Sequence, residues 1–218
     1  MKRIVCTLGI CALLATSASA DIYLNEVLGS TTSTDSEFIE LYNSGPAAVD
    51  ISNWAIELWD SDAGTAFGGS DGGSPYMIDA GTTLAAGGYY LLANTTFSTY
   101  YAATPDQVIQ ENAIENSSYT IILKDTLSAT IDSVFVSDGG TGDAANDAGT
   151  LITPGATAGP DGSYLPAGFY RAGVGSSNIA FLEFDPQPAP SATPGAANLP
   201  EPASLVLLGI AGMFLRRR

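Results

Sequence analysis

Short apolar runs, each ended by residues that favour turns, recur along this chain and restrict most strongly the folds that it can adopt. The run Ile22–Leu28 precedes a polar loop, and the run Glu37–Asn43 is closed by Ser44-Gly45-Pro46. In Trp54–Trp59, large apolar residues recur at every second position, which is the period of a β-strand. Glycine and proline at the ends of such runs mark turns. The pattern predicts an all-β protein.

The remaining candidate strands have the same length and the same kind of ends. About seven short strands separated by turns favour a β-sandwich. Two Gly/Asp-rich stretches, 60–74 and 138–166, interrupt the series, and no amphipathic helix of useful length is expected inside the body. The further candidate strands are Val49–Trp59, Tyr89–Asn94, Tyr119–Asp125, Thr130–Val136, Gly168–Arg171 and Ile179–Phe184.

The distribution of charge excludes one class of function. The 218 residues contain 23 acidic and seven basic side chains, and five of the basic ones lie at the two ends of the chain. The body keeps only Lys124 and Arg171 as bases, so its surface is strongly acidic and repels phosphate backbones. We therefore expect no nucleic-acid partner. An acidic coat of this kind keeps an exported protein soluble.

Residues 1–20 have the pattern of a secretory signal peptide, with the Sec translocon as the expected partner. Lys2 and Arg3 precede the apolar stretch Ile4–Leu14, and Ala18 and Ala20 form a small-x-small cleavage site. Both cysteines of the chain lie within these residues, so the body has neither a disulfide nor thiol chemistry.

The C-terminal residues 200–218 carry a second sorting pattern. Pro200, Glu201 and Pro202 lead into the apolar run 203–215, and Arg216, Arg217 and Arg218 end the chain. As a helix, 13 residues span roughly 20 Å, which is short of a hydrocarbon core of about 30 Å. The arrangement resembles the PEP-CTERM sorting signal of Gram-negative bacteria. The resemblance implies a short transmembrane helix that holds the chain transiently in the inner membrane, processing by an exosortase, and delivery to the cell surface or an extracellular matrix. A plain membrane anchor is the alternative.

The body resembles the lamin tail domain, an immunoglobulin-like β-sandwich. The resemblance lies in the order of Asn25-Glu26 in the first strand, Glu37–Asn43, Val49–Trp54, Leu84–Asn94 and the terminal motif Ala192–Asn198. It implies a binding or structural domain over residues 21–185, followed by a Pro/Ala linker at 186–199. The signal helix and the short apolar helix would flank this sandwich.

The inventory of reactive side chains argues against catalysis. The chain has no histidine, so Ser-His-Asp and Cys-His sites are absent. Two carboxylates at suitable spacing among the strand glutamates Glu26, Glu37, Glu40 and Glu57 could cleave a glycosidic bond. Glu40 is instead expected to accept hydrogen bonds at a strand edge or to face solvent. We predict a non-catalytic protein, with a carbohydrate-active or carbohydrate-binding protein as the alternative.

Two acidic loops and one aromatic residue are the candidate binding features. Asp60, Asp62 and Asp71 form a loop that fails the EF-hand spacing but offers oxygen ligands for weak calcium binding. A second loop contains Asp138, Asp143, Asn146 and Asp147. Trp54 is expected in the core, whereas Trp59 points to the other face and is the candidate contact for a polysaccharide or surface-protein partner.

Overall fold

In the computed structural model, the described part of the chain comprises residues 22–29, 36–64, 66–70, 73–160, 167–173, 178–183, 188–189 and 191–198. The predicted cleavage residues Ala18 and Ala20, the sorting residues 200–218 and the calcium candidate Asp71 lie outside these ranges. Within them, no helix has the length and apolar character needed to cross a membrane.

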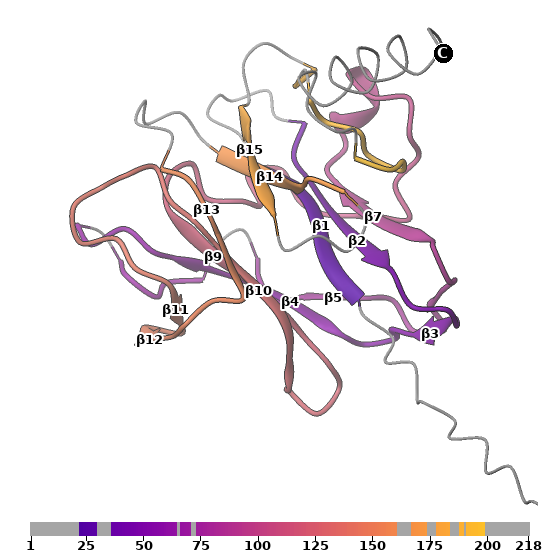
Figure 1. Cartoon of the computed structure of the whole chain (residues 1–218), viewed down its shortest axis with the longest axis horizontal. Coiled ribbons are helices and arrows are strands. Elements are labelled where there is room, and N and C mark those ends of the chain that lie inside the picture. Colours follow the sequence, from indigo (N-terminus) through magenta and orange to yellow (C-terminus); the bar gives the residue numbers. More distant parts are fainter. Residues whose placement is uncertain are drawn as a thin grey trace, which may run out of the picture.

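The regular secondary structure of the described residues is almost entirely β-strand, which confirms the predicted all-β class (Figure 1). The one helical element among the described residues is the 3-10 turn η1 (Phe97–Thr99). The strands are β1 (Ile22–Leu28), β2 (Phe38–Asn43), β3 (Val49–Asp50), β4 (Ala55–Asp60), β5 (Tyr76–Met77), β6 (Thr83–Leu84), β7 (Tyr89–Ala93), β8 (Gln107–Val108), β9 (Tyr119–Lys124), β10 (Thr130–Val136), β11 (Asn146–Asp147), β12 (Thr150–Leu151), β13 (Ala156–Ala158), β14 (Ala167–Arg171) and β15 (Ile179–Glu183).

Two main sheets make up the sandwich. One has six strands in the order β15-β14-β1-β2-β7-β8, and the other has five in the order β13-β10-β9-β4-β5. Most neighbours are antiparallel, and β7–β8 and β10–β13 are the parallel pairs among the described strands. Figure 1 shows the two sheets as separate layers, with β1 and β2 in one and β9 and β10 in the other.

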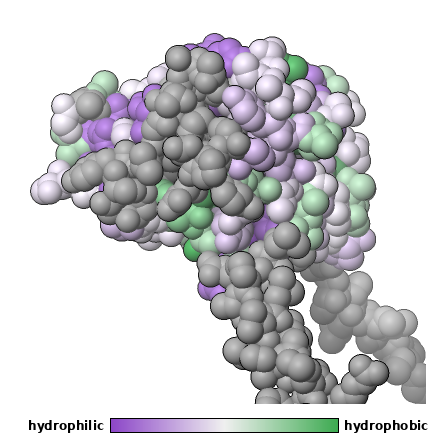
Figure 2. Space-filling view, turned by 90° about the horizontal axis from the view of Figure 1, so that it is seen from above, coloured by the Kyte–Doolittle hydropathy of each residue, from purple (hydrophilic) through white to green (hydrophobic). Residues whose placement is uncertain are grey.

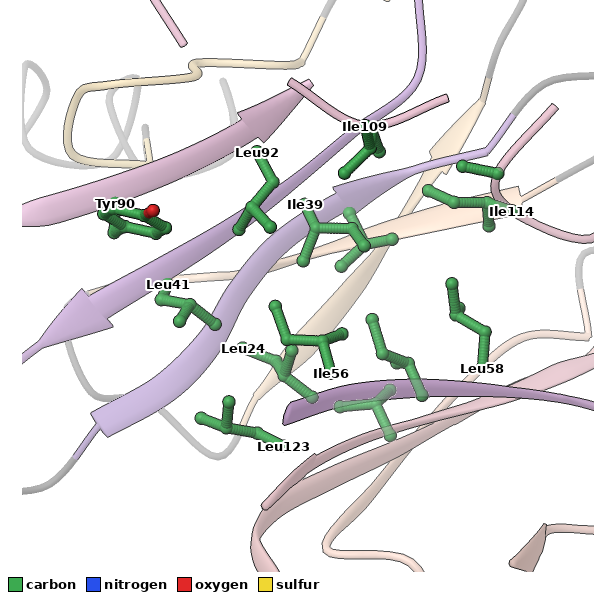
Figure 3. Packing of buried hydrophobic residues seen from close by; sticks show 14 of the residues in the cluster. Leu24, Ile39, Leu41, Ile56, Leu58, Tyr90, Leu92, Ile109, Ile114 and Leu123 are labelled. Carbon is green, nitrogen blue, oxygen red and sulfur yellow. The ribbon is translucent and has the colours of Figure 1, made fainter. Parts of the chain in front are cut away.

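The main core lies between the two sheets. In β2, Ile39 and Leu41 point toward the opposite sheet, and in β4, Ile56 and Leu58 point back toward them (Figure 3). All four side chains are fully buried. The two-residue period predicted for β4 is thus confirmed, because successive side chains of a strand point to opposite faces.

A second apolar cluster covers the opposite face of the six-stranded sheet. It contains Phe38 and Leu91, which alternate with core residues on β2 and β7, together with Phe97 and Tyr101. The Phe97 ring stacks on Tyr101 at 4.9 Å, and both rings meet Phe38 edge to face. The segment after β7 therefore folds back over its own sheet.

The structure divides the long predicted strand Val49–Trp59. Asn53 has a φ of 58°, a left-handed conformation that ends β3 before β4 begins. The stretch expected to be loose, 138–166, contains β11, β12 and β13, because its backbone pairs with itself and with β10. The two candidate strands Tyr119–Asp125 and Thr130–Val136 correspond to β9 and β10, which pair as an antiparallel hairpin.

One buried ion pair joins the two sheets. Arg171 at the end of β14 donates from Nη2 to Asp132 Oδ2 of β10 at 2.6 Å and from Nε to the Leu24 carbonyl at 2.9 Å. Both charged side chains are less than one-tenth exposed. Arg171 is therefore a structural residue, and it is one of the two bases that the body retains.

Candidate functional site

Three aspartates from two distant loops lie together at one end of the five-stranded sheet. Asp62 follows β4, whereas Asp138 and Asp143 follow β10, and one carboxylate oxygen of each lies within 4.8 Å of the others. The β4–β9–β10 pairing places the ends of these strands side by side. We name these three residues the aspartate cluster.

Two serines just before and at the edge of β9 support the aspartate cluster. Ser118 Oγ lies 2.8 Å from Asp143 Oδ2 and 3.2 Å from Asp138 Oδ1, and Ser117 Oγ donates to Asp62 Oδ2 at 2.5 Å. The backbone N–H of Asp138 in turn donates to Ser118 Oγ at 3.0 Å. The hydroxyls thus hold the carboxylates in place.

Burial and neighbouring like charges both act on the aspartate cluster. The pKa of Asp62 lies above its ordinary value, chiefly through burial and further through the neighbouring charges of Asp143 and Asp138. Grouped carboxylate oxygens are ligands that Ca²⁺ and Mg²⁺ prefer. Of the chain's described residues, these three are the set whose geometry suits a divalent cation.

This arrangement differs from the two separate calcium loops that the sequence predicts. Asp60 is buried and its Oδ1 accepts the backbone N–H of Asp62 at 2.8 Å, so it serves the loop itself. Asn146 donates to the Asp60 carbonyl at 2.8 Å, and Asp147 pairs with Lys124. Asp62 of the first predicted loop therefore lies with Asp138 and Asp143 of the second in one cluster.

The predicted ligand contact, Trp59, lies on the face of β4 turned away from the core. Its Nε1–H donates to Glu57 Oε2 at 3.1 Å, and the same oxygen lies 2.7 Å from Lys124 Nζ. Both tryptophans are partly exposed, and Trp54 packs against the main core. Trp59, Glu57, Lys124 and Asp147 thus form a mixed aromatic and charged patch.

The strand glutamates considered for catalysis have structural partners instead. Glu37 is fully buried and accepts the backbone N–H groups of Ala113 at 2.8 Å and Ile114 at 3.0 Å, which fixes the loop before β9. Glu57 pairs with Lys124. The expectation that Glu40 faces solvent or a strand edge is wrong, because β2 lies between β1 and β7 and its side chain is fully buried.

Glu26 and Glu40 bind the C-terminal segment of the chain, residues 191–198, which we call the clasp. Glu26 Oε1 accepts a hydrogen bond from the backbone N–H of Thr193 at 2.9 Å, and Glu40 Oε2 accepts one from the backbone N–H of Gly195. Asn198 Nδ2 donates to the carbonyl of Arg171 at 2.8 Å. The clasp lies in the expected linker 186–199, whose described residues are therefore docked on the sheet rather than extended in solvent.

A tight turn gives the clasp its shape. The Ala196 N–H donates to the Thr193 carbonyl at 3.0 Å, and Gly195 has a φ of +79°. Proline at the second position and glycine with positive φ at the third are the signature of a type II turn. The turn points the N–H groups of Thr193 and Gly195 at the two carboxylates.

The two clasp-binding carboxyls have strongly raised pKa values. Burial, and then the charge of Glu40, raises the pKa of Glu26 to about 8. Burial likewise raises the pKa of Glu40 to about 7, against the hydrogen bonds from Gly195 and Asn25 that favour the charged form. Arg171, one of the two bases of the body, is engaged by Asp132. Glu26 and Glu40 are cross-strand partners, so ionising both is costly.

The sequence identifies Glu26 and Glu40 as candidate residues but does not predict that they bind the clasp. The available signal was an acidic residue among apolar neighbours in two central strands, together with Thr193-Pro194-Gly195 as a turn near the end of the body. Buried carboxylates need donors, and exposed turn amides supply them.

The comparisons with known proteins agree with this architecture. The family model described as Lamin Tail Domain matches residues 15–138, which include β1 through β10 and end at Asp138 of the aspartate cluster. No curated protein matches the chain. The matched residues contain Glu26, Glu37 and Glu40, whereas the clasp lies beyond them.

Proposed function

The chain belongs to the lamin tail domain family, and from this premise we propose that it is an exported, non-catalytic protein of the cell surface or an exopolysaccharide matrix. The domain is a rigid binding or structural module. Its partners during export are the Sec translocon, the inner membrane and an exosortase. Its final partner is a polysaccharide or another surface protein.

One observation carries the proposal. A β-sandwich with an acidic body is bracketed in the sequence by a signal-peptide pattern at 1–20 and by the ordered elements Pro200-Glu201-Pro202, 203–215 and Arg216–Arg218. An apolar segment of this length can insert into a locally thinned bilayer, with the arginines behind it held on the cytoplasmic side. The patterns at the two ends of the sequence both predict export through the inner membrane.

The burial of the candidate acids supports a non-catalytic role. A glycosidase needs two carboxyl groups that reach the substrate. Glu26, Glu37 and Glu40 have no exposed surface, and Glu57 is held by Lys124. The family itself is a structural, immunoglobulin-like one.

The proposal is tested by following the protein in a producing bacterium that has an exosortase. Wild-type protein should reach the surface, where it is accessible to added protease, whereas Glu201→Ala combined with replacement of the three terminal arginines should leave it in the inner membrane. Glu111→Gln, at an exposed glutamate of the body, is the control and should sort normally. Equal distribution of all three proteins would refute sorting by this signal.

Carbohydrate binding without catalysis is the second candidate, and the position of Trp59 favours it. A partly exposed indole beside Glu57 and Lys124 provides a stacking surface and polar groups next to it. In a glycan array, the wild-type domain should bind an immobilised glycan, and Trp59→Ala should abolish this binding. Trp54, which packs against the core, is left unchanged in this variant. An array on which the wild-type domain retains no glycan would remove this candidate.

A further inference from the structure

The clasp ends immediately before the sorting sequence. Asn198 is buried on the sheet, and its amide donates to the Arg171 carbonyl and, at 3.3 Å, to Asn25 Oδ1. Glu201 follows three residues later. Three fully extended residues span at most roughly 11 Å, at about 3.5 Å each.

We propose that the clasp restrains processing: the Asn198 end of the clasp must leave the sheet before the chain can be cut near Glu201. The inference rests on the proposed sorting function, and it assigns to the folded domain control over the cleavage step of sorting. Proteolysis requires exposed, adaptable chain, and hydrogen-bonded, buried backbone resists it. Residues directly before the proposed cut are held on the domain, so only the released form is a substrate.

The clasp has two anchors of different kinds. The inner anchor is the type II turn, whose amides from Thr193 and Gly195 are bound by the buried carboxyls of Glu26 and Glu40. The outer anchor is the side chain of Asn198, which donates to the carbonyl groups of Arg171 and Asn25 and accepts from the Thr193 hydroxyl at 3.0 Å. Opening the outer anchor breaks the contact between Asn198 and Thr193 but does not itself remove the amide–carboxyl hydrogen bonds of the inner anchor.

Full opening is opposed by the second apolar cluster. Ala192 packs against this cluster, and the nearby Ala189 is itself buried in it, its N–H donating to the Tyr101 hydroxyl at 3.0 Å. Removing the whole segment would expose this apolar surface and take the clasp's donors from both carboxyls, leaving Glu40 with the Asn25 amide at 2.7 Å. Release limited to Asn198 avoids both costs and still frees the residues next to Glu201.

The fraction of released chains then sets the processing rate. When a competent form is a minor population, the observed rate scales with its fraction. Losing the hydrogen bonds of one neutral side chain changes such an equilibrium by about 3- to 10-fold. Asn198→Ala should therefore speed processing by about that factor.

The experiment is a pulse–chase of the full chain in producing cells, read as the ratio of uncut to cut protein. Asn198→Ala is compared with wild type and with Asn116→Ala, an exposed asparagine of the body. Hydrogen exchange of the purified full chain, measured by mass spectrometry over residues 191–198, reports clasp opening independently. The expected result is faster exchange and faster processing for Asn198→Ala alone.

A second variant keeps the test valid if that change has other effects. Gly195→Ala strains the turn at a φ of +79° and brings a Cβ within 3.4 Å of Ala103. Its control is Gly87→Ala, at a φ of +68° with open space around it. Gly195→Ala, and not Gly87→Ala, should speed exchange and processing.

Three results would overturn the inference. Faster exchange of the clasp with unchanged or slower processing would show that the clasp does not restrain the cut. Rapid exchange of residues 191–198 in the wild type would show that no clasp is closed in solution. Absence of a cut product in every variant would instead refute the sorting function, and the inference would fail with it.

Discussion

Replacing Glu26 with glutamine should remove a large pH dependence from the stability of this protein. The carboxyl of Glu26 has a pKa raised from 4.5 to about 8 in the folded protein, and that of Glu40 is raised to about 7. A group whose pKa is raised by folding binds protons more tightly in the native state. Its contribution is fully present below the unfolded pKa and is lost as pH rises through the folded pKa.

The expected window is therefore between about pH 4.5 and 8. Each unit of pKa shift corresponds to about 1.4 kcal/mol, so ionisation of Glu26 alone costs of the order of 5 kcal/mol across this window. The chain has no histidine, so few other side chains titrate there. The fall in stability should thus be clearly assignable to the pair Glu26 and Glu40.

Urea unfolding followed by tryptophan fluorescence at pH 5 to 9 measures the effect. Wild type should lose stability steadily as pH rises, and Glu26→Gln should give a much flatter profile, because glutamine still offers an oxygen to the Thr193 N–H without titrating. Glu111→Gln, at an exposed position, should keep the wild-type slope. A wild-type stability that is constant or rises from pH 5 to 8 would refute the reasoning, as would a Glu26→Gln profile with the wild-type slope.

Three further predictions concern single contacts. Arg171→Ala leaves Asp132 buried without its cation and should lower the free energy of unfolding by about 3–5 kcal/mol, measured by urea denaturation; a loss below about 1 kcal/mol would contradict the role given to this pair. Gly168→Ala should prevent correct pairing of β14 with β1, because a Cβ there would lie 1.9 Å from the Val27 carbonyl oxygen, and a wild-type melting temperature would be inconsistent with that register. The predicted weak calcium binding is now expected at Asp62, Asp138 and Asp143: millimolar Ca²⁺ should raise the melting temperature of wild type and not of Asp143→Asn, and an unchanged wild-type value would end this prediction.

Local pattern was sufficient to predict much of the fold. The alternation in β4 and the turn after β2 are properties of neighbouring residues, and the strands there lie where the sequence predicts them. The order of these segments also indicated the family whose model matches the chain. The break at Asn53 was missed because a left-handed asparagine leaves no mark in the apolar pattern.

The contacts between distant residues could not be predicted in the same way. Asp62 meets Asp138 and Asp143 only because β4, β9 and β10 are neighbours in one sheet. The clasp has the composition of a linker, and its docking depends on carboxyls about 170 residues earlier, roughly the separation of Thr193 from Glu26. A buried glutamate in a strand shows that a donor is needed but does not show which segment supplies it.

Mass spectrometry of the termini of the protein recovered from native cells tests the central claim most directly. Export and sorting predict a surface or matrix protein that begins at Asp21 and ends upstream of the apolar segment 203–215. Recovery of the uncut chain, Met1 to Arg218, from the cytosol would contradict the account.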